Sequence, residues 1–512
     1  MATASPHAAI IGTSVSGLAA ALALGLRGYS VTCIERDSTP MPRDHLDAFA
    51  KWDRRGAAQT RHSHVLLAPL VKLLKANAAD FYQQLLAAGA EELGFAELVR
   101  NSFGNAPLEP GDEDITFLAC RRVVFEFLLR RYIAQRHGVR IIEGATVIGL
   151  LAQPGEPPRV TGVRYQQTSG IAELGADIVI DASGRHGASD AWLGAIGAKA
   201  PAQETSPCGI FYTSRFYRLR DGADYPELDG RKSTAGGVQG VDLGYLKVGL
   251  FRADNRTFSI TLAADPEDKP MRAVSQEREF DIAANQIEAT RAWVHPATSE
   301  PISKVYLYGN LSNTHKCFVR DGVPVVLNYF AIGDAHVHTN PISGRGCALG
   351  WVCAFELAEV LTAESDAYQR ALRFEARVEA RILPWYRLQV GQDKQSIEIN
   401  KALQRGEDPY TFERPDGTID EAKQRLAIFR KGIPAAAREH LDVLRALFRH
   451  TNLLELPEAL FARQDLIGKI LSSYEQHKNE ESRLRPAREE LLTFFRQTPG
   501  MTAASVTDAA TG

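Results

Sequence analysis

The stretch AAIIGTSVSGLAAALALGLRGYSVTCIERD, residues 8–37, decides the fold. Its apolar start predicts a short buried strand, TSVSG a tight turn, residues 18–28 a helix that ends at Gly28, and residues 30–37 a second strand. Gly12, Ser14 and Gly17 fall in or beside the turn, and Glu35 follows near the end of the second strand. The spacing therefore predicts a βαβ unit that binds a dinucleotide.

Each part of this unit has a chemical role. Gly12 allows the tight turn, the small Ser14 lets the backbone approach a pyrophosphate, and Gly17 lets helix and strand pack closely. The start of the helix supplies N–H donors to the anion, and Glu35 accepts hydrogen bonds from the adenosine ribose. Ser14 replaces the middle glycine of the full NAD fingerprint. A lone glycine turn is common between ordinary helices and strands, so the combination of strand, turn, helix and acid carries the prediction.

Composition narrows the function classes. A chain of 512 residues is expected to form two or three domains, and 45% hydrophobic with 24% charged residues is typical of a soluble protein. The net charge of −3 does not indicate a nucleic-acid partner. Six cysteines without a C-x-x-C pair argue against disulfides or zinc, and favour a reduced, cytoplasmic protein. The apolar run 8–26 lacks a basic flank and contains three glycines, so we expect no stable membrane insertion.

A second stretch, YFAIGDAHVHTNPISGRGCALG, residues 329–350, decides between NAD and FAD. Gly333 and Asp334 end an apolar strand, and Pro341, Gly344 and Gly346 open an apolar helix. The Asp334 carboxylate would accept from a ribityl hydroxyl, and N–H groups at the new helix would approach flavin N1 and O2. A simple dehydrogenase needs no such distant site, so the pair of stretches favours FAD.

We expect an α/β (α+β) fold: a Rossmann-like FAD-binding domain with an inserted β-sheet substrate domain and a helical C-terminal region. The β-rich phrases YLKVGLFRADN and RTFSITLAADP predict a hairpin that turns at ADNR. The expected division is 1–75, 111–195 and 311–370 for the FAD-binding domain, 76–110 for a helical part of the substrate region, 196–310 for the sheet domain, 371–498 for the C-terminal helices and 499–512 for a disordered tail.

GTSVSGL…IERD, RHSHVLL, RRVVFEFLLR, DASGRHG and GDAHVHTNPISGRGCALG together resemble the FAD-dependent monooxygenases of the para-hydroxybenzoate hydroxylase-like superfold. The resemblance covers about residues 7–370 and is closest to the squalene-epoxidase-like and polyketide-epoxidase branch. Its motifs are specific for the fold and much less specific for the reaction.

The resemblance implies a set of residues for non-covalent FAD. Arg122, four residues before Glu126, would reach the pyrophosphate or ribose, Val147 the adenine edge, and Arg61 the cofactor from a mobile loop. The remaining implied contacts are Gly12, Ser14, Val15, Ser16, Gly17, Glu35 and Arg36 for the ADP half, Asp181 after a strand, Gly333 and Asp334 for the ribityl chain, and Pro341, Gly344, Arg345 and Gly346 for the isoalloxazine.

The candidate catalytic residues are His64, His336, His338 and Arg215. His62 and His64 have strand spacing, so one would face the flavin and the other the protein; a metal site there lacks further ligands, and no metal is expected. His336 and His338 stand where the family has plainer residues. One of them would donate a proton or hydrogen bond on the substrate side of the flavin, or both would only cap the loop. Arg215 would point into the substrate cavity, or lie at the surface of its strand.

The implied reaction inserts one oxygen atom from O2, through a flavin C4a-hydroperoxide, into a small apolar olefin or aromatic ring of natural-product type. Electrons come from NAD(P)H or from a separate flavin reductase. The reductase is considered because Asp181 is followed by Ala-Ser-Gly, whereas the NAD(P)H-driven aromatic hydroxylases have an Asp-Gly dipeptide in this motif. There are three alternatives. The first is a reductase or dehydrogenase acting on a C–C bond, and the second is a non-catalytic flavin-binding protein. The third is a flavin halogenase, against which the missing W-x-W-x-I-P motif argues. The protein would be a monomer or homodimer.

Overall fold

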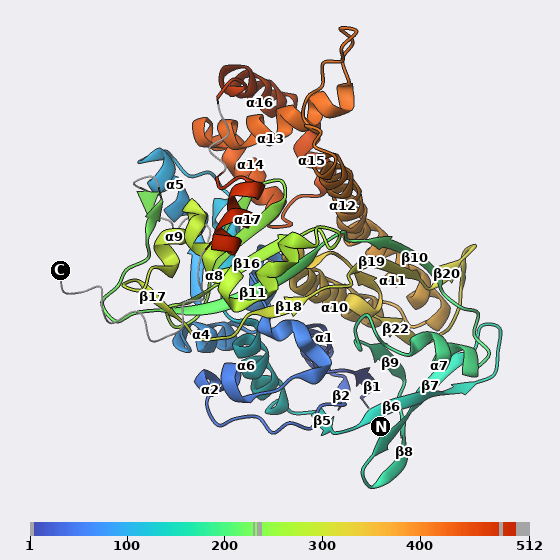
Figure 1. The fold of residues 1–512 in the computed structure, drawn as a ribbon. Coiled ribbons are helices and arrows are strands. Elements are labelled where there is room, and N and C mark those ends of the chain that lie inside the picture. The colour runs from blue at the N-terminus through green and yellow to red at the C-terminus, as the bar shows by residue number, and fades with distance from the viewer. Residues whose placement is uncertain (1–4, 229–230, 233–237, 481–484, 498–512) are drawn as a thin grey trace.

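The computed structural model describes residues 5–228, 231–232, 238–480 and 485–497. Figure 1 shows a parallel sheet with its helices, an antiparallel sheet beside it, and a group of C-terminal helices reached along the long helix α12 (Leu383–Gln404). The mixture of helices and sheets confirms the expected α/β class. The expected tail, 499–512, lies outside the described residues.

The parallel sheet has five strands in the order β22-β9-β1-β2-β5, and all its neighbours run parallel. Its strands come from widely separated parts of the chain: β1 (His7–Ile11), β2 (Ser30–Glu35), β5 (Val139–Glu143), β9 (Ile178–Asp181) and β22 (Tyr329–Ala331). In β1, Ala8 and Ile10 join one apolar core while Ala9 and Ile11 join another, because alternate side chains point to opposite faces. Both faces of the sheet are therefore covered, as parallel sheets require.

Helices cover the face of Ala8 and Ile10, and a small antiparallel sheet covers the other. The helical side contains α1 (Val15–Gly25), α3 (Ala68–Asn77), α4 (Ala79–Ala87), α6 (Arg122–Ala134) and α10 (Gly346–Ala363). The other side contains β6 (Thr146–Gln153), β7 (Arg159–Gln167), β8 (Gly170–Gly175) and α7 (Ser189–Ala195). Among the described residues one helix, α10, is long and apolar enough to cross a membrane, yet 67% of it is buried in the protein.

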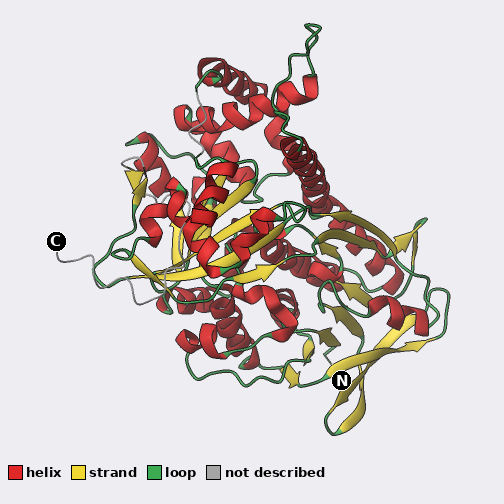
Figure 2. Ribbon diagram, in the orientation of Figure 1, coloured by secondary structure: helices red, strands yellow, loops and turns green. Residues whose placement is uncertain are grey.

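The antiparallel sheet forms the second layer (Figure 2). Its strands are β14 (Val238–Asp242), β15 (Leu246–Arg252), β16 (Thr257–Ala264), β11 (Phe211–Leu219) and β17 (Ser299–Pro301), and β18 (Tyr306–Tyr308) also pairs with β11. Strands β15 and β16 form the predicted hairpin, and Asn255 and Arg256 turn it with positive φ angles. One face packs on α8 (Glu277–Gln286), α9 (Glu288–Val294) and α17 (Arg488–Gln497).

The C-terminal third is helical, as expected, and one of its helices lies apart from the others. Its helices are α11 (Ala367–Arg381), α12, α13 (Glu421–Glu439), α14 (Leu441–Thr451), α15 (Pro457–Ala462) and α16 (Gln464–His477). Helices α13, α14 and α16 share a core with α5 (Phe95–Phe103). Helix α17 leaves this group and packs on the antiparallel sheet, so the boundary expected at residue 371 does not separate the two parts in space.

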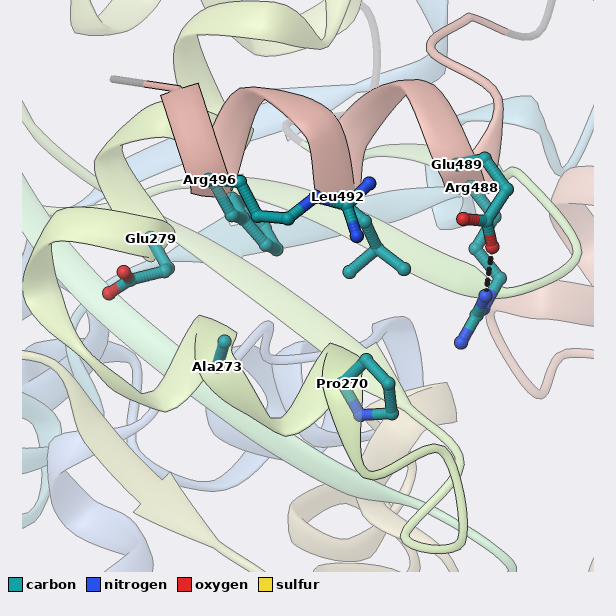
Figure 3. A pocket seen from close by; sticks show the side chains of 8 residues that line it. Pro270, Ala273, Glu279, Arg488, Glu489, Leu492 and Arg496 are labelled. Atoms are coloured by element: carbon teal, nitrogen blue, oxygen red, sulfur yellow. Dashed lines mark hydrogen bonds and ion pairs between the residues drawn. The ribbon is translucent and has the colours of Figure 1, made fainter. Parts of the chain in front are cut away.

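A hollow of about 380 Å³ lies where α17 meets η3 (Pro270–Ser275) and α8. Figure 3 shows Leu492 of α17 directed toward the segment that carries Pro270 and Ala273. None of the lining residues belongs to the predicted cofactor site. The remaining elements are α2 (His45–Lys51), η1 (Arg55–Arg61), β3 (Glu91–Gly94), β4 (Thr116–Ala119), β10 (Ala202–Pro207), β19 (Ser312–Cys317), η4 (Gly333–Ala335), β23 (Val337–His338) and η5 (Pro341–Ser343), besides a few shorter pieces.

Candidate functional site

The turn between β1 and α1 requires its two glycines. Gly12 has a φ of +95°, and a Cβ there would lie 2.8 Å from the carbonyl oxygen of Ala182. A Cβ at Gly17 would clash with the carbonyl oxygen of Gly12. Ser14 is the N-cap of α1 and makes no side-chain cap hydrogen bond, so amides of the first turn remain available to an anion.

The Ser14 hydroxyl instead joins a buried polar network. It donates to a Glu126 carboxylate oxygen at 3.0 Å and accepts from Arg122 Nη2 at 2.9 Å. Arg122 Nη1 lies 3.1 Å from His64 Nε2. The Nε of Arg122 is buried without a hydrogen-bond partner, and it lies 3.7 Å from a Glu126 carboxylate oxygen in an ion pair within α6.

Glu35 ends β2 beside the same turn, as the βαβ pattern requires. Its carboxylate accepts from the backbone N–H of Thr13 at 3.1 Å and from that of Asp37 at 2.9 Å. Burial raises the pKa of Glu35, but Arg54 and these hydrogen bonds outweigh it, so the pKa is lowered and the group is ionised. Glu35 is therefore an acceptor at the position expected for a ribose.

Arg54 is a site residue that sequence reasoning missed. Its guanidinium pairs with Glu126 at 2.8 Å and with Glu35 and Asp37, each at 3.3 Å. Burial lowers the pKa of Arg54, but these three carboxylates together raise it well above its usual value. In the sequence Arg54 stands beside Arg55 in a polar segment, and nothing there distinguishes the buried arginine from the exposed one.

The second stretch packs directly on the first. Gly333 has a φ of +57°, and a Cβ there would lie 2.5 Å from Ser16 Oγ. A Cβ at Gly350 in α10 would clash with the same Ser16 hydroxyl. Ser16 thus fills a notch between the start of η4 and α10, and it joins two stretches that lie over three hundred residues apart. The Asp334 carboxylate next to this notch has no hydrogen-bond partner among the residues that the structure describes.

Helix α12 supports the loop that precedes α10. Asp393 accepts from Asn340 Nδ2 at 2.9 Å, from Asn313 Nδ2 at 2.7 Å and from Gln389 Nε2 at 2.8 Å. The Asn340 side chain accepts from the backbone N–H of Ile342 and so caps η5. Burial raises the pKa of Asp393 above its usual value, and the hydrogen bonds from these amides offset only part of that increase. The loop is held from the α12 side by this side-chain network.

Arg345 was expected at the flavin and lies elsewhere. Its guanidinium donates to Gln389 at 3.2 Å and stacks over the ring of Trp385, 5.1 Å from its centroid. Burial lowers the pKa of Arg345 to about 10. The side chain therefore supports the loop from the α12 side. Gly344 has a φ of +65°, and a Cβ there would lie 3.0 Å from Val65, so the RHSHVLL segment lies against this loop.

An aromatic cluster lies against Ile342 of this loop. Ile342 packs with Tyr212 and Tyr308 in one apolar cluster. The His62 ring lies 5.0 Å from Tyr212 and 5.4 Å from Tyr308, and its Nδ1 is 3.1 Å from Ser214 Oγ. Burial lowers the pKa of His62 to about 4. The pKa of Tyr212 is raised, mainly by burial and to a smaller extent by the Asp334 carboxylate. Tyr212 and Tyr308 were not predicted as site residues, and only their aromatic type marks them in the sequence. His62 is one of the two histidines of which one was expected to face the flavin.

His64 is neutral and faces Arg122. Its Nε2 must accept from Arg122, which can only donate, and its Nδ1 donates to the carbonyl oxygen of His62 at 2.9 Å. Burial, and then the charge of Arg122, lower the pKa of His64 to about 3. His64 therefore orients Arg122, and it holds no proton to give at neutral pH.

His336 and His338 point in different directions. His338 Nδ1 lies 2.7 Å from the carbonyl oxygen of Ser312, across the β19–β23 ladder. His336 is buried against Phe318 and Phe374, and it faces Glu375 of α11. The expectation that His336 lines the substrate side does not agree with this position, because its ring turns to the helix behind the loop.

Arg215 also lies away from the site. Its guanidinium pairs with Asp281 at 2.6 Å and Glu277 at 3.2 Å, both on α8, while the preceding residue, Ser214, faces His62. Alternate residues of a strand point to opposite faces, and α8 covers the face of Arg215. The idea that Arg215 enters the substrate cavity is therefore wrong.

The surroundings of four further predicted residues are as follows. Asp181 is buried and already accepts from Ser183 N–H at 2.9 Å and from the Tyr329 hydroxyl at 2.7 Å. Val147 is buried in β6. Arg36 is exposed. Arg61 donates to the carbonyl oxygen of Phe49 at 2.7 Å and lies over Tyr306, at the edge of the aromatic cluster.

The comparisons with known proteins bear on the fold. No family model matches the sequence. Protein Rv3254 of Mycobacterium tuberculosis is 26% identical over 392 residues, which cover 72% of this chain and 76% of that protein. p-Nitrophenol 4-monooxygenase PnpA of Pseudomonas putida covers 89% of this chain and all (100%) of its own, at 15% identity and a TM-score of 0.55. The myxobacterial chondrochloren halogenase CndH, an FAD-dependent halogenase, covers 95% of this chain and 99% of its own, at 15% identity and a TM-score of 0.52.

The chain has the fold of the FAD-dependent monooxygenases and halogenases. This confirms the predicted fold, whereas the epoxidase branch remains a prediction. At such identities a shared fold does not carry the reaction with it, so the chemistry must be argued from the site.

Proposed function

We propose that this chain is an FAD-dependent monooxygenase that transfers one oxygen atom from O2 to an apolar olefinic or aromatic substrate, by epoxidation or hydroxylation. One observation carries the proposal. The β1–α1 turn and the Gly333–Asp334 segment meet at Ser16, so an anion-binding helix start and an unpaired carboxylate belong to one continuous cradle. In an extended flavin dinucleotide, the pyrophosphate would bind at the helix start and the ribityl chain at the carboxylate.

The residues present fit FAD. No Cβ fills the turn at Gly12 and Gly17, and the buried Nε of Arg122 has no hydrogen-bond partner. The amides of α1 would bind the pyrophosphate with Arg122, Glu35 would accept from the ribose beside Arg54, and Asp334 would accept from a ribityl hydroxyl. The bound flavin supplies the electron transfer and the activation of O2, which no protein side chain provides.

The aromatic cluster supports the proposed substrate class. The rings of His62, Tyr212 and Tyr308 form a wall beside Ile342 of the loop that would carry the isoalloxazine. Such a wall would hold an apolar substrate and exclude water from the reacting atoms. His62 stays neutral at physiological pH because burial lowers its pKa to about 4. His338 would serve as a hydrogen-bonding residue of the loop, since its Nδ1 lies 2.7 Å from the carbonyl oxygen of Ser312.

The electron donor would be NAD(P)H bound transiently or a separate flavin reductase. Among the described residues we find one dinucleotide turn, at Gly12, so a reduced nicotinamide would have no βαβ unit of its own. The six cysteines are all free, which suits a reducing cytoplasm. We propose a monomer or homodimer.

Flavin loading tests the cofactor assignment. Purified protein should bind FAD stoichiometrically, and Asp334→Ala should weaken FAD binding by about 10- to 100-fold, because a hydrogen bond to a charged group contributes about 1.5–3 kcal/mol. Asp47→Ala is the matched control, since Asp47 lies on α2 and pairs only with Lys51 at the surface. Protein that takes up no flavin when FAD is supplied would refute the proposal.

Oxygen use then separates the reactions. With NAD(P)H or a flavin reductase, a monooxygenase consumes O2 in step with substrate and places one labelled atom from isotopic O2 in the product. A reductase of the same fold would alter a C–C bond without O2, and a halogenase would require halide. Substrate conversion without label in the product would exclude the proposed reaction while leaving the FAD site intact.

A further inference from the structure

Behind the loop that carries Asp334, three potential metal ligands face one another. His315 comes from β19, His336 directly follows η4, and Glu375 comes from α11. The Nε2 of His336 lies 3.5 Å from one Glu375 oxygen, and the Nε2 of His315 lies 3.9 Å from the other. One ligand atom from each residue can be chosen so that all three lie within 4.8 Å of one another.

Three imidazole nitrogens of this cluster lack a hydrogen-bond partner. His336 is 2% exposed, and neither of its ring nitrogens has a hydrogen-bond partner; the Nε2 of His315, which is 7% exposed, has none either. Buried polar atoms without partners are rare, because each costs about 1–3 kcal/mol. The cluster is therefore incomplete as a hydrogen-bonded network.

The separations fit a shared ion better than they fit hydrogen bonds. Ligand atoms at about 2.0–2.2 Å from a tetrahedral ion lie roughly 3.3–3.6 Å apart, whereas a hydrogen bond of this kind measures about 2.7–3.2 Å. The 3.5 Å between His336 and one Glu375 oxygen falls in the first range, the 3.9 Å between His315 and the other oxygen lies above it, and one atom from each residue lies within 4.8 Å of the others. A tetrahedral ion would therefore draw the three side chains closer together.

The chemistry of the surroundings also suits a divalent cation. The Glu375 carboxylate is 15% exposed and faces both imidazoles, and carboxylate and imidazole groups are ordinary ligands of divalent cations. Cys317 lies two residues from His315 on the same face of β19, but its thiol donates to the carbonyl oxygen of Val319 at 2.9 Å, so we do not count it among the ligands. Phe318 and Phe374 pack on the His336 ring and shield it from water.

We propose that His315, His336 and Glu375 bind a divalent transition-metal ion, of which Zn²⁺ fits the two imidazoles and one carboxylate best. The ion would join three elements, β19, the segment after Asp334 and α11. It would act as a structural clamp for the wall on which the cofactor loop rests, and it takes no part in electron transfer. The proposal stands on these residues alone and does not depend on the proposed reaction.

Metal analysis of the full-length protein, prepared without an affinity histidine tag, tests the site. The protein is dialysed against Zn²⁺ or Co²⁺, freed of loose metal, and assayed by plasma mass spectrometry. We expect stoichiometric metal, a visible ligand-field spectrum with Co²⁺ typical of low coordination number, and a melting temperature that falls when a chelator removes the ion.

Variants assign the ligands. Glu375→Gln and His336→Gln should lose the bound metal and the response of the melting temperature to chelator. Glu379→Gln, one turn along α11 and paired with Arg387 at the surface, should keep both. Wild-type protein that retains no metal after loading overturns the proposal, and so does full retention in Glu375→Gln. If a variant fails to fold, the metal content and cobalt spectrum of the wild type still decide. FAD content, measured on the same samples, separates this outcome from failure of the flavin site.

Discussion

At the scale of single residues, Gly333 and Ser16 show how the backbone sets the site. Both the φ of +57° and the 2.5 Å approach to Ser16 Oγ oppose a side chain at position 333. Gly333→Ala should therefore destabilise the protein by about 1–3 kcal/mol, measured by urea unfolding. Gly391→Ala is the control, because Gly391 lies in α12 with open space around its Cα, and this change should be neutral or stabilise by about 0.5–1 kcal/mol. Equal stability of the two variants would contradict the argument.

His64 makes a residue-level prediction about pH. Its folded pKa is about 3, while an unfolded histidine titrates near about 6.5. Below about pH 6.5 the unfolded chain binds a proton that the folded chain does not, so stability is full above this pH and falls as the pH drops toward 3. The loss from His64 at about pH 5 should be about 2 kcal/mol.

Urea unfolding at about pH 7.5 and about pH 5 measures this loss. His64→Gln should lose less stability between the two pH values than the wild type, since glutamine does not titrate. His137→Gln, which changes an exposed histidine, should keep the wild-type difference. A His64→Gln protein with the wild-type difference would show that His64 is not buried as a neutral group.

Residues whose role depends on the backbone were predictable, and residues whose role depends on side-chain direction were not. Gly12 and Gly333 are required by the turns at the ends of their strands, so their spacing revealed them. Arg215 lies on a predicted strand, but only the packing of α8 decides which face it occupies. His336 likewise needed the position of α11, more than thirty residues further along the chain, before its direction was known.

At the scale of elements, α12 fixes the loop at Pro341 through Asp393. Replacing Asp393 by Asn removes one acceptor oxygen and turns an NH2 group toward donors of Asn313, Asn340 or Gln389. Leaving a buried donor unpaired costs about 1–3 kcal/mol, so Asp393→Asn should lower stability by this amount and weaken FAD binding through the loosened loop. Glu398→Gln, an exposed change on α12, is the control. Unchanged stability together with unchanged FAD affinity would argue against this support.

Elements themselves follow well from local patterns. The β15–β16 hairpin and the apolar α10 were predicted because alternation and apolar runs are properties of the segment itself. The support from α12 was not predicted, because Gln389 and Asp393 are ordinary polar residues of a helix until the fold brings Asn313 and Asn340 beside them.

At the scale of the whole molecule, α17 returns from the C-terminal end to close the core of the antiparallel sheet. Leu491, Leu492 and Phe495 are buried with α8 and β16, and Arg488 pairs with Asp268 at 2.7 Å. Sequence reasoning assigned this helix to the C-terminal group, because nothing in a short amphipathic helix states which sheet it will cover. The elements on which α17 packs became known only from the folded structure.

The role of α17 can be tested by two truncations. A chain that ends at residue 484 loses three buried apolar side chains, and at about 1.5–3 kcal/mol each it should lose roughly 4–9 kcal/mol of stability, as an upper estimate. Increased binding of a hydrophobic dye should accompany the loss, because the apolar side chains of α8 and η3 that α17 covers become exposed. A chain that ends at residue 498 keeps α17 and should retain the wild-type melting temperature. If the shorter chain melts as the longer one does, α17 is not part of that core, and the antiparallel sheet is stable on α8 and α9 alone.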